Sequence, residues 1–199
     1  MKPSPGCERT SEILSRMHRF HLVRKYVHGI SRERKEQLTE KVFAEQLFKD
    51  KKSSYSDSIA EIFIFDRIGL NQLENFTKMN KNLEKIKQDH EKIQYLSKIH
   101  KYDRHGYKMR ERYLIITDKK LHLIDSKSYS SKEIISYSLI SSVVLSNRSD
   151  GLFLIKVSPN LKNQKGDLIL ESSFKLIELI TKLVKVLGIQ KLIITDSNS

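Results

Sequence analysis

Basic side chains gather in the middle of the sequence, in the fifteen residues from Lys98 to Arg112. This stretch contains six Lys/Arg and two acidic residues, so its net charge is 6 − 2 = +4. Lys108, Arg110 and Arg112 are spaced by two, which in a β-strand directs their side chains to the same face. Lys101, at the end of a preceding strand, can join them across the hairpin. Four converging cations predict a phosphate-binding site, because Arg offers paired planar donors and Lys a point charge.

The rest of the sequence offers little catalytic chemistry. It has no Gly-x-x-x-x-Gly-Lys-Ser/Thr loop for nucleotide phosphates. His18 and His21 fall on one side of a helix, but no further ligands lie at a matching spacing for a metal. The single cysteine, Cys7, permits no internal disulfide, and its Pro/Gly-containing surroundings would not position a nucleophile. We therefore expect a protein of a reducing compartment with no catalytic residue, no cofactor and no metal site.

The overall charge indicates the same kind of ligand as the basic stretch. The 199 residues include 37 Lys/Arg and 24 Asp/Glu, which gives a formal net charge of +13. Such a balance favours polyanionic partners such as phospholipid headgroups or nucleic acid. No apolar signal segment follows Met1, and three charged residues interrupt the most apolar stretch, 176–189. Any contact with a bilayer is therefore expected to be peripheral.

The elements that could position the basic residues begin near residue 92, where apolar residues alternate with period two. We expect seven strands, at about 94–102, 109–117, 120–125, 133–138, 142–147, 152–158 and 166–171. An amphipathic helix follows from Phe174 to Leu187, with Ser172 or Ser173 as its cap and Gly188 as its stop. Antiparallel strands closed by one helix indicate a mainly β fold with flanking α-helices, arranged as a pleckstrin-homology-like barrel over residues 92–199.

A helical segment, residues 5–57, is expected before the barrel. Its first helix has apolar residues at steps of three or four between Ile13 and Ile30, a cap at Thr10 or Ser11, and a stop at Gly29. Residues 1–54 contain thirteen Lys/Arg and seven acidic residues, a net charge of 13 − 7 = +6. This segment is therefore expected to provide a second basic surface.

A second helix and a connector complete the expected layout. The helix from Ser31 should turn Leu38, Val42 and Leu47 inward, and residues 49–54 are expected to form a polar loop. Residues 58–91 are predicted to be a connector. Within it the apolar run 62–65 is compatible with a strand, and 73–79 shows helical spacing.

Several short motifs carry a resemblance to a known family. They are His90–Tyr95, Ile99–Arg104 with Gly106–Lys108, Arg112–Thr117, Ser146–Asn147 with Ser149–Gly151, and Val157–Pro159 with Lys165–Asp167. Upstream, the matching stretches are Val23–Tyr26, Gly29–Ile30 and Glu33–Lys35. Together they resemble the tail homology 1 (TH1) domain of class I myosins, the membrane-binding tail of single-headed motors. The resemblance covers nearly the whole chain and is weakest at about 59–89.

The resemblance implies binding of anionic phospholipids, notably phosphatidylinositol 4,5-bisphosphate, by a pleckstrin-homology-like fold. The lipid signature of the family is a Lys near the end of the first strand, then basic-x-Arg in the second. It matches Lys101 and the pair Arg110 and Arg112, with Lys108 in support. The auxiliary contacts expected beside them are Lys98, Arg104 and His105.

The resemblance also implies a cellular location and bears on enzyme activity. It implies a cytoplasmic protein, peripheral at the inner face of the plasma membrane or of endomembranes and associated with the actin cortex. The resemblance covers the tail alone and includes no motor ATPase domain, so we expect no enzyme activity from this sequence.

Other partners stay open at this stage. Nucleic-acid binding fits the charge, but no recognition helix, zinc finger or aromatic-studded strand is evident, and we expect none. Calmodulin binding is an alternative because Leu14, Arg19, Arg24 and Val27 follow the spacing of a degenerate IQ motif. A helix packed on the barrel explains the same stripe and is the interpretation that we favour. Contact with F-actin rests on the family resemblance only.

Overall fold

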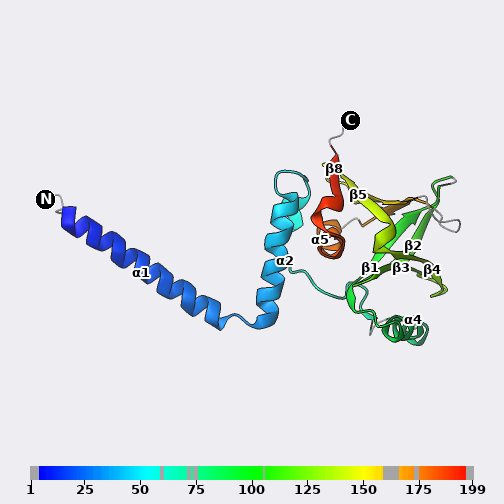
Figure 1. Cartoon of the computed structure of the whole chain (residues 1–199), viewed down its shortest axis with the longest axis horizontal. Coiled ribbons are helices and arrows are strands. Elements are labelled where there is room, and N and C mark those ends of the chain that lie inside the picture. The colour runs from blue at the N-terminus through cyan, green and yellow to red at the C-terminus, as the bar shows by residue number, and fades with distance from the viewer. Residues whose placement is uncertain are drawn as a thin grey trace. The chain divides into compact units, whose positions relative to one another are not determined.

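Figure 1 shows the computed structural model, which describes residues 5–58, 61–70, 73, 76–104, 106–158, 166–172 and 175–195. The chain forms two compact units, Met1–Thr39 and Glu40–Ser199. The first contains α1 (Pro5–Gly29), and the boundary falls inside α2 (Arg32–Phe48). None of the helices in the described ranges is long and apolar enough to cross a bilayer.

The second unit is built on one eight-stranded sheet with the order β4-β3-β2-β1-β7-β6-β5-β8. Its strands are β1 (Ile93–Tyr102), β2 (Met109–Thr117), β3 (Lys120–Asp125), β4 (Ser131–Ser136), β5 (Ile140–Ser146), β6 (Leu152–Val157), β7 (Leu168–Glu171) and β8 (Leu192–Thr195). The first seven pair antiparallel, within each meander and between β1 and β7. The seven expected strands are confirmed, with shifts of about two residues at some ends, in a pleckstrin-homology-like arrangement.

The eighth strand was not expected from the sequence. β8 lies parallel to β5, with Val143 opposite Leu192 and Ser146 opposite Thr195. Its apolar residues form a short continuous run, so it lacks the alternation by which the other strands are recognised.

The inner face of the sheet and α5 (Leu176–Leu187) form the main core, as expected for a helix that closes a barrel. Leu114 and Leu179 are both fully buried in it. Gly188 ends the helix with φ +95°, in the left-handed region that glycine tolerates, as the sequence indicates. The expected cap at Ser172 is wrong, because Lys175 occupies the N-cap position without a side-chain hydrogen bond; Ser173 lies outside the described residues.

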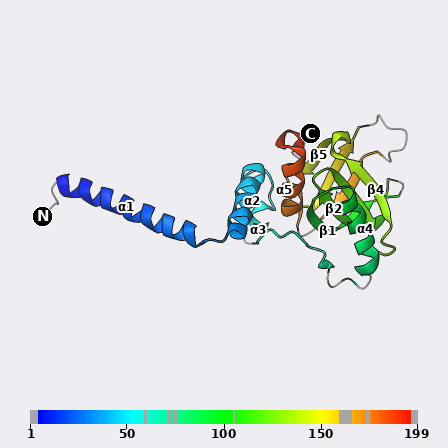
Figure 2. The ribbon, with the colours of Figure 1, turned by 60° about the horizontal axis from the view of Figure 1, so that its bottom comes forward.

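A second core lies on the outer face of the sheet, under α4 (Phe76–Gln88). Figure 2 shows α4 and α5 against different sides of the sheet. The buried residues of this core are Met79, Leu83, Ile86, Leu96, Tyr113, Ile115, Ile124 and Tyr129. The helical spacing in the connector is therefore confirmed, with its start at Phe76. The apolar run 62–65 forms no strand: Phe63 is buried in the main core, and next to the run only Asp66 makes an isolated bridge, to Leu96.

Helix α2 uses a different face from the one predicted. Leu47 is buried as expected, but Leu38 and Val42 are exposed. Ala44 and Phe48 are buried instead. The face of the helix that packs on the main core follows a spacing of three and four residues and ends at Phe48. The helix therefore contributes to the barrel unit with its last turns.

Helix α1 ends at Gly29 as predicted but begins at Pro5, before the expected caps at Thr10 and Ser11. Its apolar stripe, which includes Ile13 and Met17, is exposed. The packing of this stripe against the barrel, like calmodulin binding, stays a prediction.

The expected polar loop after α2 contains a buried lysine. The Lys52 side chain is 0% exposed, and its Nζ donates to the carbonyl oxygens of Ser146 at 3.0 Å and Arg148 at 2.5 Å. The ammonium also lies 3.3 Å from Oδ1 of Asp150. Lys52 thus fixes the end of α2 to the β5–β6 turn, which the sequence did not reveal because lysine is rarely buried.

A buried carboxylate joins the start of β1 to the β2–β3 hairpin. The Glu91 side chain is 0% exposed; its Oε2 accepts from the Thr117 hydroxyl at 2.6 Å and lies 2.9 Å from Nε2 of His122. Its Oε1 lies 2.9 Å from Nζ of Lys120. Burial opposes ionisation of Glu91, but the hydrogen bonds from Thr117, Lys120 and His122 outweigh it and lower the pKa to about 2.

Candidate functional site

Three of the predicted basic residues lie at one rim of the barrel, where the inward-facing side chains change from apolar to charged. On β1, buried Ile99 is followed two residues later by Lys101. On β2, buried Leu114 is preceded at the same spacing by Arg112 and then by Arg110. The strand register places Lys101 opposite Arg110 and Ile99 opposite Arg112. The three cations therefore share the inner face of the sheet, as the alternation predicted.

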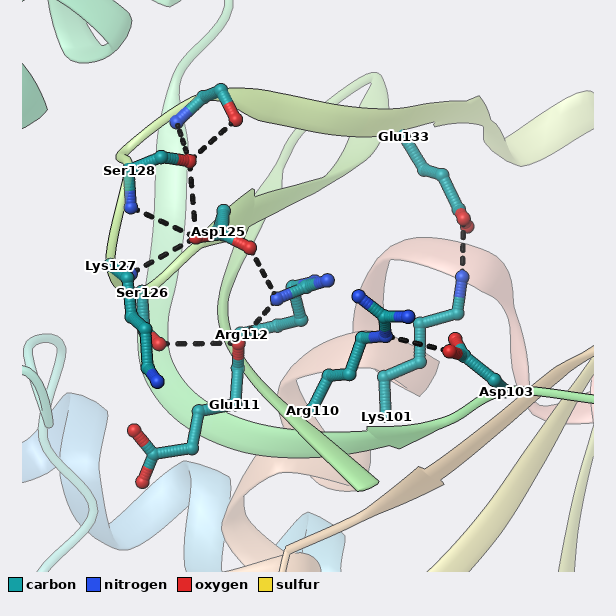
Figure 3. Close-up of polar contacts among 11 residues, drawn as sticks. Lys101, Asp103, Arg110, Glu111, Arg112, Asp125, Ser126, Lys127, Ser128 and Glu133 are labelled. Atoms are coloured by element: carbon teal, nitrogen blue, oxygen red, sulfur yellow. Dashed lines mark hydrogen bonds and ion pairs between the residues drawn. The ribbon is translucent and has the colours of Figure 1, made fainter. Parts of the chain in front are cut away.

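The same rim also holds three acidic residues, which the spacing of the basic residues does not predict. Asp125 ends β3 opposite Arg112, and Glu133 lies on β4 opposite Leu123. Asp103 follows directly after β1. Figure 3 shows that each carboxylate points at one of the basic side chains. We call these three cations and three anions the charged rim.

Each cation of the charged rim has an acidic partner. Lys101 Nζ pairs with Glu133, and Nε of Arg110 lies 2.6 Å from Oδ2 of Asp103. Arg112 Nη1 donates to Oδ2 of Asp125 at 2.6 Å (Figure 3). The six residues of the charged rim therefore have a net charge of 3 − 3 = 0, although the hairpin sequence alone has a net charge of +4. Any anion that binds here must compete with carboxylates of the protein itself.

The accessibility of the three cations differs. The Arg110 side chain is 48% exposed, whereas Lys101 is 15% and Arg112 is 10% exposed. The hydrogen bond from Arg110 holds the pKa of Asp103 below its usual value, so that carboxyl remains ionised. Arg110 is therefore the member of the charged rim that an approaching ligand meets first.

Arg112 has a structural task at the rim. Besides Asp125 it donates to the carbonyl oxygen of Glu111 at 2.8 Å. Asp125 in turn accepts from the backbone of Lys127 at 3.1 Å and of Ser128 at 2.9 Å, which shapes the β3–β4 turn. The bonds from Ser128 are the main cause of the lowered pKa of Asp125, and the charge of Arg112 contributes. Arg112 thus fixes this turn against β2 (Figure 3).

The other predicted residues are placed differently from the three cations of the charged rim. Lys108 is exposed and precedes the first residue of β2, so strand alternation does not set its direction. Lys98 lies on the opposite face, where its Nζ is 2.8 Å from Oε1 of Glu111. Arg104 donates instead to the carbonyl oxygen of Asp167 at 3.0 Å. His105 lies outside the described residues.

The missed carboxylates left only a partial signal in the sequence. The alternation Leu121, Leu123, Asp125 places Asp125 on the inner face at the end of its strand. Glu133 lies 32 residues from Lys101, and its position depends on a register shift between Leu123 and Ile124. The local sequence therefore predicts which residues of a strand face inward, but it does not predict the net charge of the rim, which depends on residues far apart in the sequence.

Comparisons with known proteins agree with this architecture. A family model described as "Unconventional myosin tail, actin- and lipid-binding" matches residues 54–199. Unconventional myosin IC of Drosophila melanogaster is 36% identical over 201 residues, covering 98% of this chain and 19% of that protein. Human unconventional myosin-Ih is 37% identical over 184 residues, covering 92% and 17%. The chain thus spans less than a fifth of either relative.

Solved structures with a similar backbone include two pleckstrin-homology domains. The Slm1-PH domain in complex with inositol-4-phosphate has a TM-score of 0.40 and 16% identity, covering 48% of this chain and 96% of that one. The N-terminal PH domain of human ARAP2 protein has a TM-score of 0.37 and 20% identity, covering 48% and 79%.

Proposed function

Because this chain belongs to the tail homology 1 family of class I unconventional myosins, we propose that it binds anionic phospholipids through the charged rim. The family is described as actin- and lipid-binding. Phosphoinositides are the headgroups that we expect to be preferred, phosphatidylinositol 4,5-bisphosphate above all, because several phosphates can engage several cations at once.

The observation that supports this proposal is the convergence of Lys101 and Arg110, paired directly across β1 and β2 at the end of the inner face. A phosphate can replace the carboxylate of Asp103 or Glu133 as the partner of either cation, since both kinds of anion accept the same donors. Lys108 provides an exposed positive charge two residues before Arg110. Arg112, which is less exposed than Arg110, adds positive charge to the rim while it fixes the β3–β4 turn.

The energy available from the basic residues is limited. Each Lys or Arg near an anionic bilayer contributes about 1 kcal/mol, so four contribute at most about 4 kcal/mol, and the three carboxylates of the charged rim oppose this contribution. The basic residues alone therefore give a dissociation constant no lower than about 1 mM. Tight binding therefore needs bidentate contacts to a polyphosphorylated headgroup or additional basic surface.

The amino-terminal helices are the proposed source of that additional surface. Residues 1–39 contain nine Lys/Arg and four acidic residues, a net charge of 9 − 4 = +5. Deletion of residues 1–54 is an unsuitable test, because it removes Phe48 and Lys52 from the barrel unit. Deletion of residues 1–39 keeps those contacts and should weaken binding to anionic vesicles.

Vesicle co-sedimentation tests the assignment of the rim. Arg110→Ala and Lys101→Ala should each weaken binding to vesicles that contain phosphatidylinositol 4,5-bisphosphate. Lys98→Ala is the matched control, because it removes the same charge from the opposite face of the same hairpin. Equal binding by all three variants would refute the site. Stronger retention by an oligonucleotide than by these vesicles, at matched salt, would favour the nucleic-acid alternative.

The proposed cellular role follows from the family. The tail would hold an actin-based motor at the cytoplasmic face of the plasma membrane or of endomembranes. Calmodulin remains a second candidate partner for the exposed apolar and basic stripe of α1. A pull-down of the full chain with calcium-free calmodulin, with Val23→Asp as the disrupting variant, tests it.

A further inference from the structure

Two large apolar side chains project from the tip of the β1–β2 hairpin, next to the charged rim. Tyr107 is 70% exposed and Met109 is 54% exposed. They flank Lys108 and precede Arg110, so apolar and cationic residues alternate over four positions. Single exposed apolar residues are common on protein surfaces and need no explanation. This pair differs because both members lie at the tip of the hairpin that carries the cationic site.

The backbone of the tip does not account for a tyrosine at position 107. Gly106 and Tyr107 have φ values of +74° and +47°, both in the left-handed region. Glycine, or asparagine, adopts this region more easily than an aromatic residue. The hairpin is closed by a hydrogen bond of 3.0 Å from the Asp103 N–H to the carbonyl oxygen of Lys108, which any side chain at position 107 permits. The ring is therefore placed in solvent at a conformational cost.

The chemistry of the tip fits the boundary between lipid headgroups and acyl chains. Tyrosine favours this boundary because its ring is apolar and its hydroxyl remains hydrated. Methionine is flexible and adapts to an irregular apolar surface. Lys108 and Arg110 are exposed, and long cationic side chains of this kind can extend towards headgroup phosphates while apolar neighbours lie deeper.

We propose that Tyr107 and Met109 form a wedge that enters the headgroup–acyl boundary of an anionic bilayer when the charged rim binds headgroup phosphates. This inference rests on the proposed function, because the cations bring the tip to the surface. The wedge adds an apolar contribution that is insensitive to salt, whereas the contribution of the rim falls as salt rises. A bilayer is the favoured occupant over a protein because the wedge alternates with cations, which complement a surface of phosphates.

Tryptophan fluorescence gives a direct test, because the chain contains no tryptophan. Tyr107→Trp places a single reporter at the tip, and Ile189→Trp places one at a residue of similar exposure, 55%, just after α5. Both full-length variants are titrated with phosphatidylcholine vesicles that contain phosphatidylinositol 4,5-bisphosphate, and with soluble inositol 1,4,5-trisphosphate. We expect a blue shift and quenching by brominated acyl chains for the tip reporter with vesicles only, and neither for the control.

The outcomes separate this inference from the proposed function. If the vesicles co-sediment the protein but the tip emission does not shift, the wedge is wrong and the rim assignment stands. If the vesicles do not bind the protein, the proposed function is wrong and the wedge that rests on it is wrong as well. A blue shift that grows with protein concentration in the absence of lipid would assign the tip to a second protein copy and overturn the inference.

Removal of the side chains measures the contribution of the wedge. Tyr107→Ala should weaken vesicle binding about 5- to 10-fold, as expected for partial burial of one large apolar side chain. The loss should persist at high salt, where Arg110→Ala has little further effect. Ile189→Ala is the control and should bind like the parent protein. Equal binding by Tyr107→Ala and Ile189→Ala would contradict the inference.

Discussion

Glu133→Gln should strengthen binding to anionic membranes, because it removes the carboxylate that neutralises Lys101 in the charged rim. In the charged rim, Glu133 pairs with Lys101, and both side chains are at most 15% exposed. The substitution removes one negative charge and leaves an amide oxygen that can still accept a hydrogen bond from Nζ. Lys101 then keeps its position but loses the carboxylate that neutralises it.

The expected gain follows from the charge alone. One additional net positive charge near an anionic surface contributes about 1 kcal/mol, which is roughly a fivefold tighter interaction. Loss of the charge-assisted hydrogen bond should lower the free energy of unfolding by about 1–3 kcal/mol, towards the smaller value because the pair lies at a solvent-accessible rim. Binding and stability should therefore change in opposite directions.

The assay is vesicle co-sedimentation at fixed lipid composition and several salt concentrations, with thermal unfolding measured on the same samples. Glu111→Gln is the matched control, because it makes the same change of charge on the opposite face of β2, where Glu111 pairs with Lys98. The interpretation of the rim would be refuted if Glu133→Gln bound no more tightly than Glu111→Gln.

Three further predictions concern the residues that hold the barrel unit together. Arg112→Ala should lower the free energy of unfolding by about 3 kcal/mol because it leaves Asp125 without its partner, and hydrogen exchange at the β3–β4 turn should increase; unchanged exchange would contradict this. The ionised form of Glu91, with its pKa lowered to about 2, should contribute about 3 kcal/mol above pH 4.5 that is lost as the pH falls towards 2. Glu91→Gln should flatten urea-unfolding free energies across that acidic range, and an unaltered profile would count against it. Phe48→Ala should destabilise the barrel unit by about 3–5 kcal/mol in chemical unfolding, whereas exposed Val42→Ala should have little effect.

The sequence predicted the parts of the fold that depend on local alternation. Seven strands and the closing helix follow from period-two and helical spacing, and so does the shared face of Lys101, Arg110 and Arg112. The position of Lys108 did not follow from the same rule, because β2 begins one residue later. Local alternation thus predicts which face of the sheet a side chain takes within a strand, but it does not predict the direction of a side chain beyond the end of that strand.

The parts that were missed depend on contacts between distant segments. The pairing of Glu133 with Lys101 requires the strand order and a register shift, neither of which alternation specifies. Strand β8 exists because β5 offers a free edge to a short apolar run. The buried face of α2 and the burial of Lys52 are set by surfaces that form only when the barrel is complete.

Helix α2 has a mechanical consequence. The helix continues through the boundary at Glu40, and its last turn is fixed by Phe48 in the core and by Lys52 on the β5–β6 turn. Earlier along the helix, Glu40 pairs with Lys182 and Lys185 of α5. Tension applied to the chain before Glu40 is therefore divided among these ion pairs, the buried Phe48 side chain and the hydrogen bonds of the Lys52 ammonium, so no single contact of α2 carries the whole load.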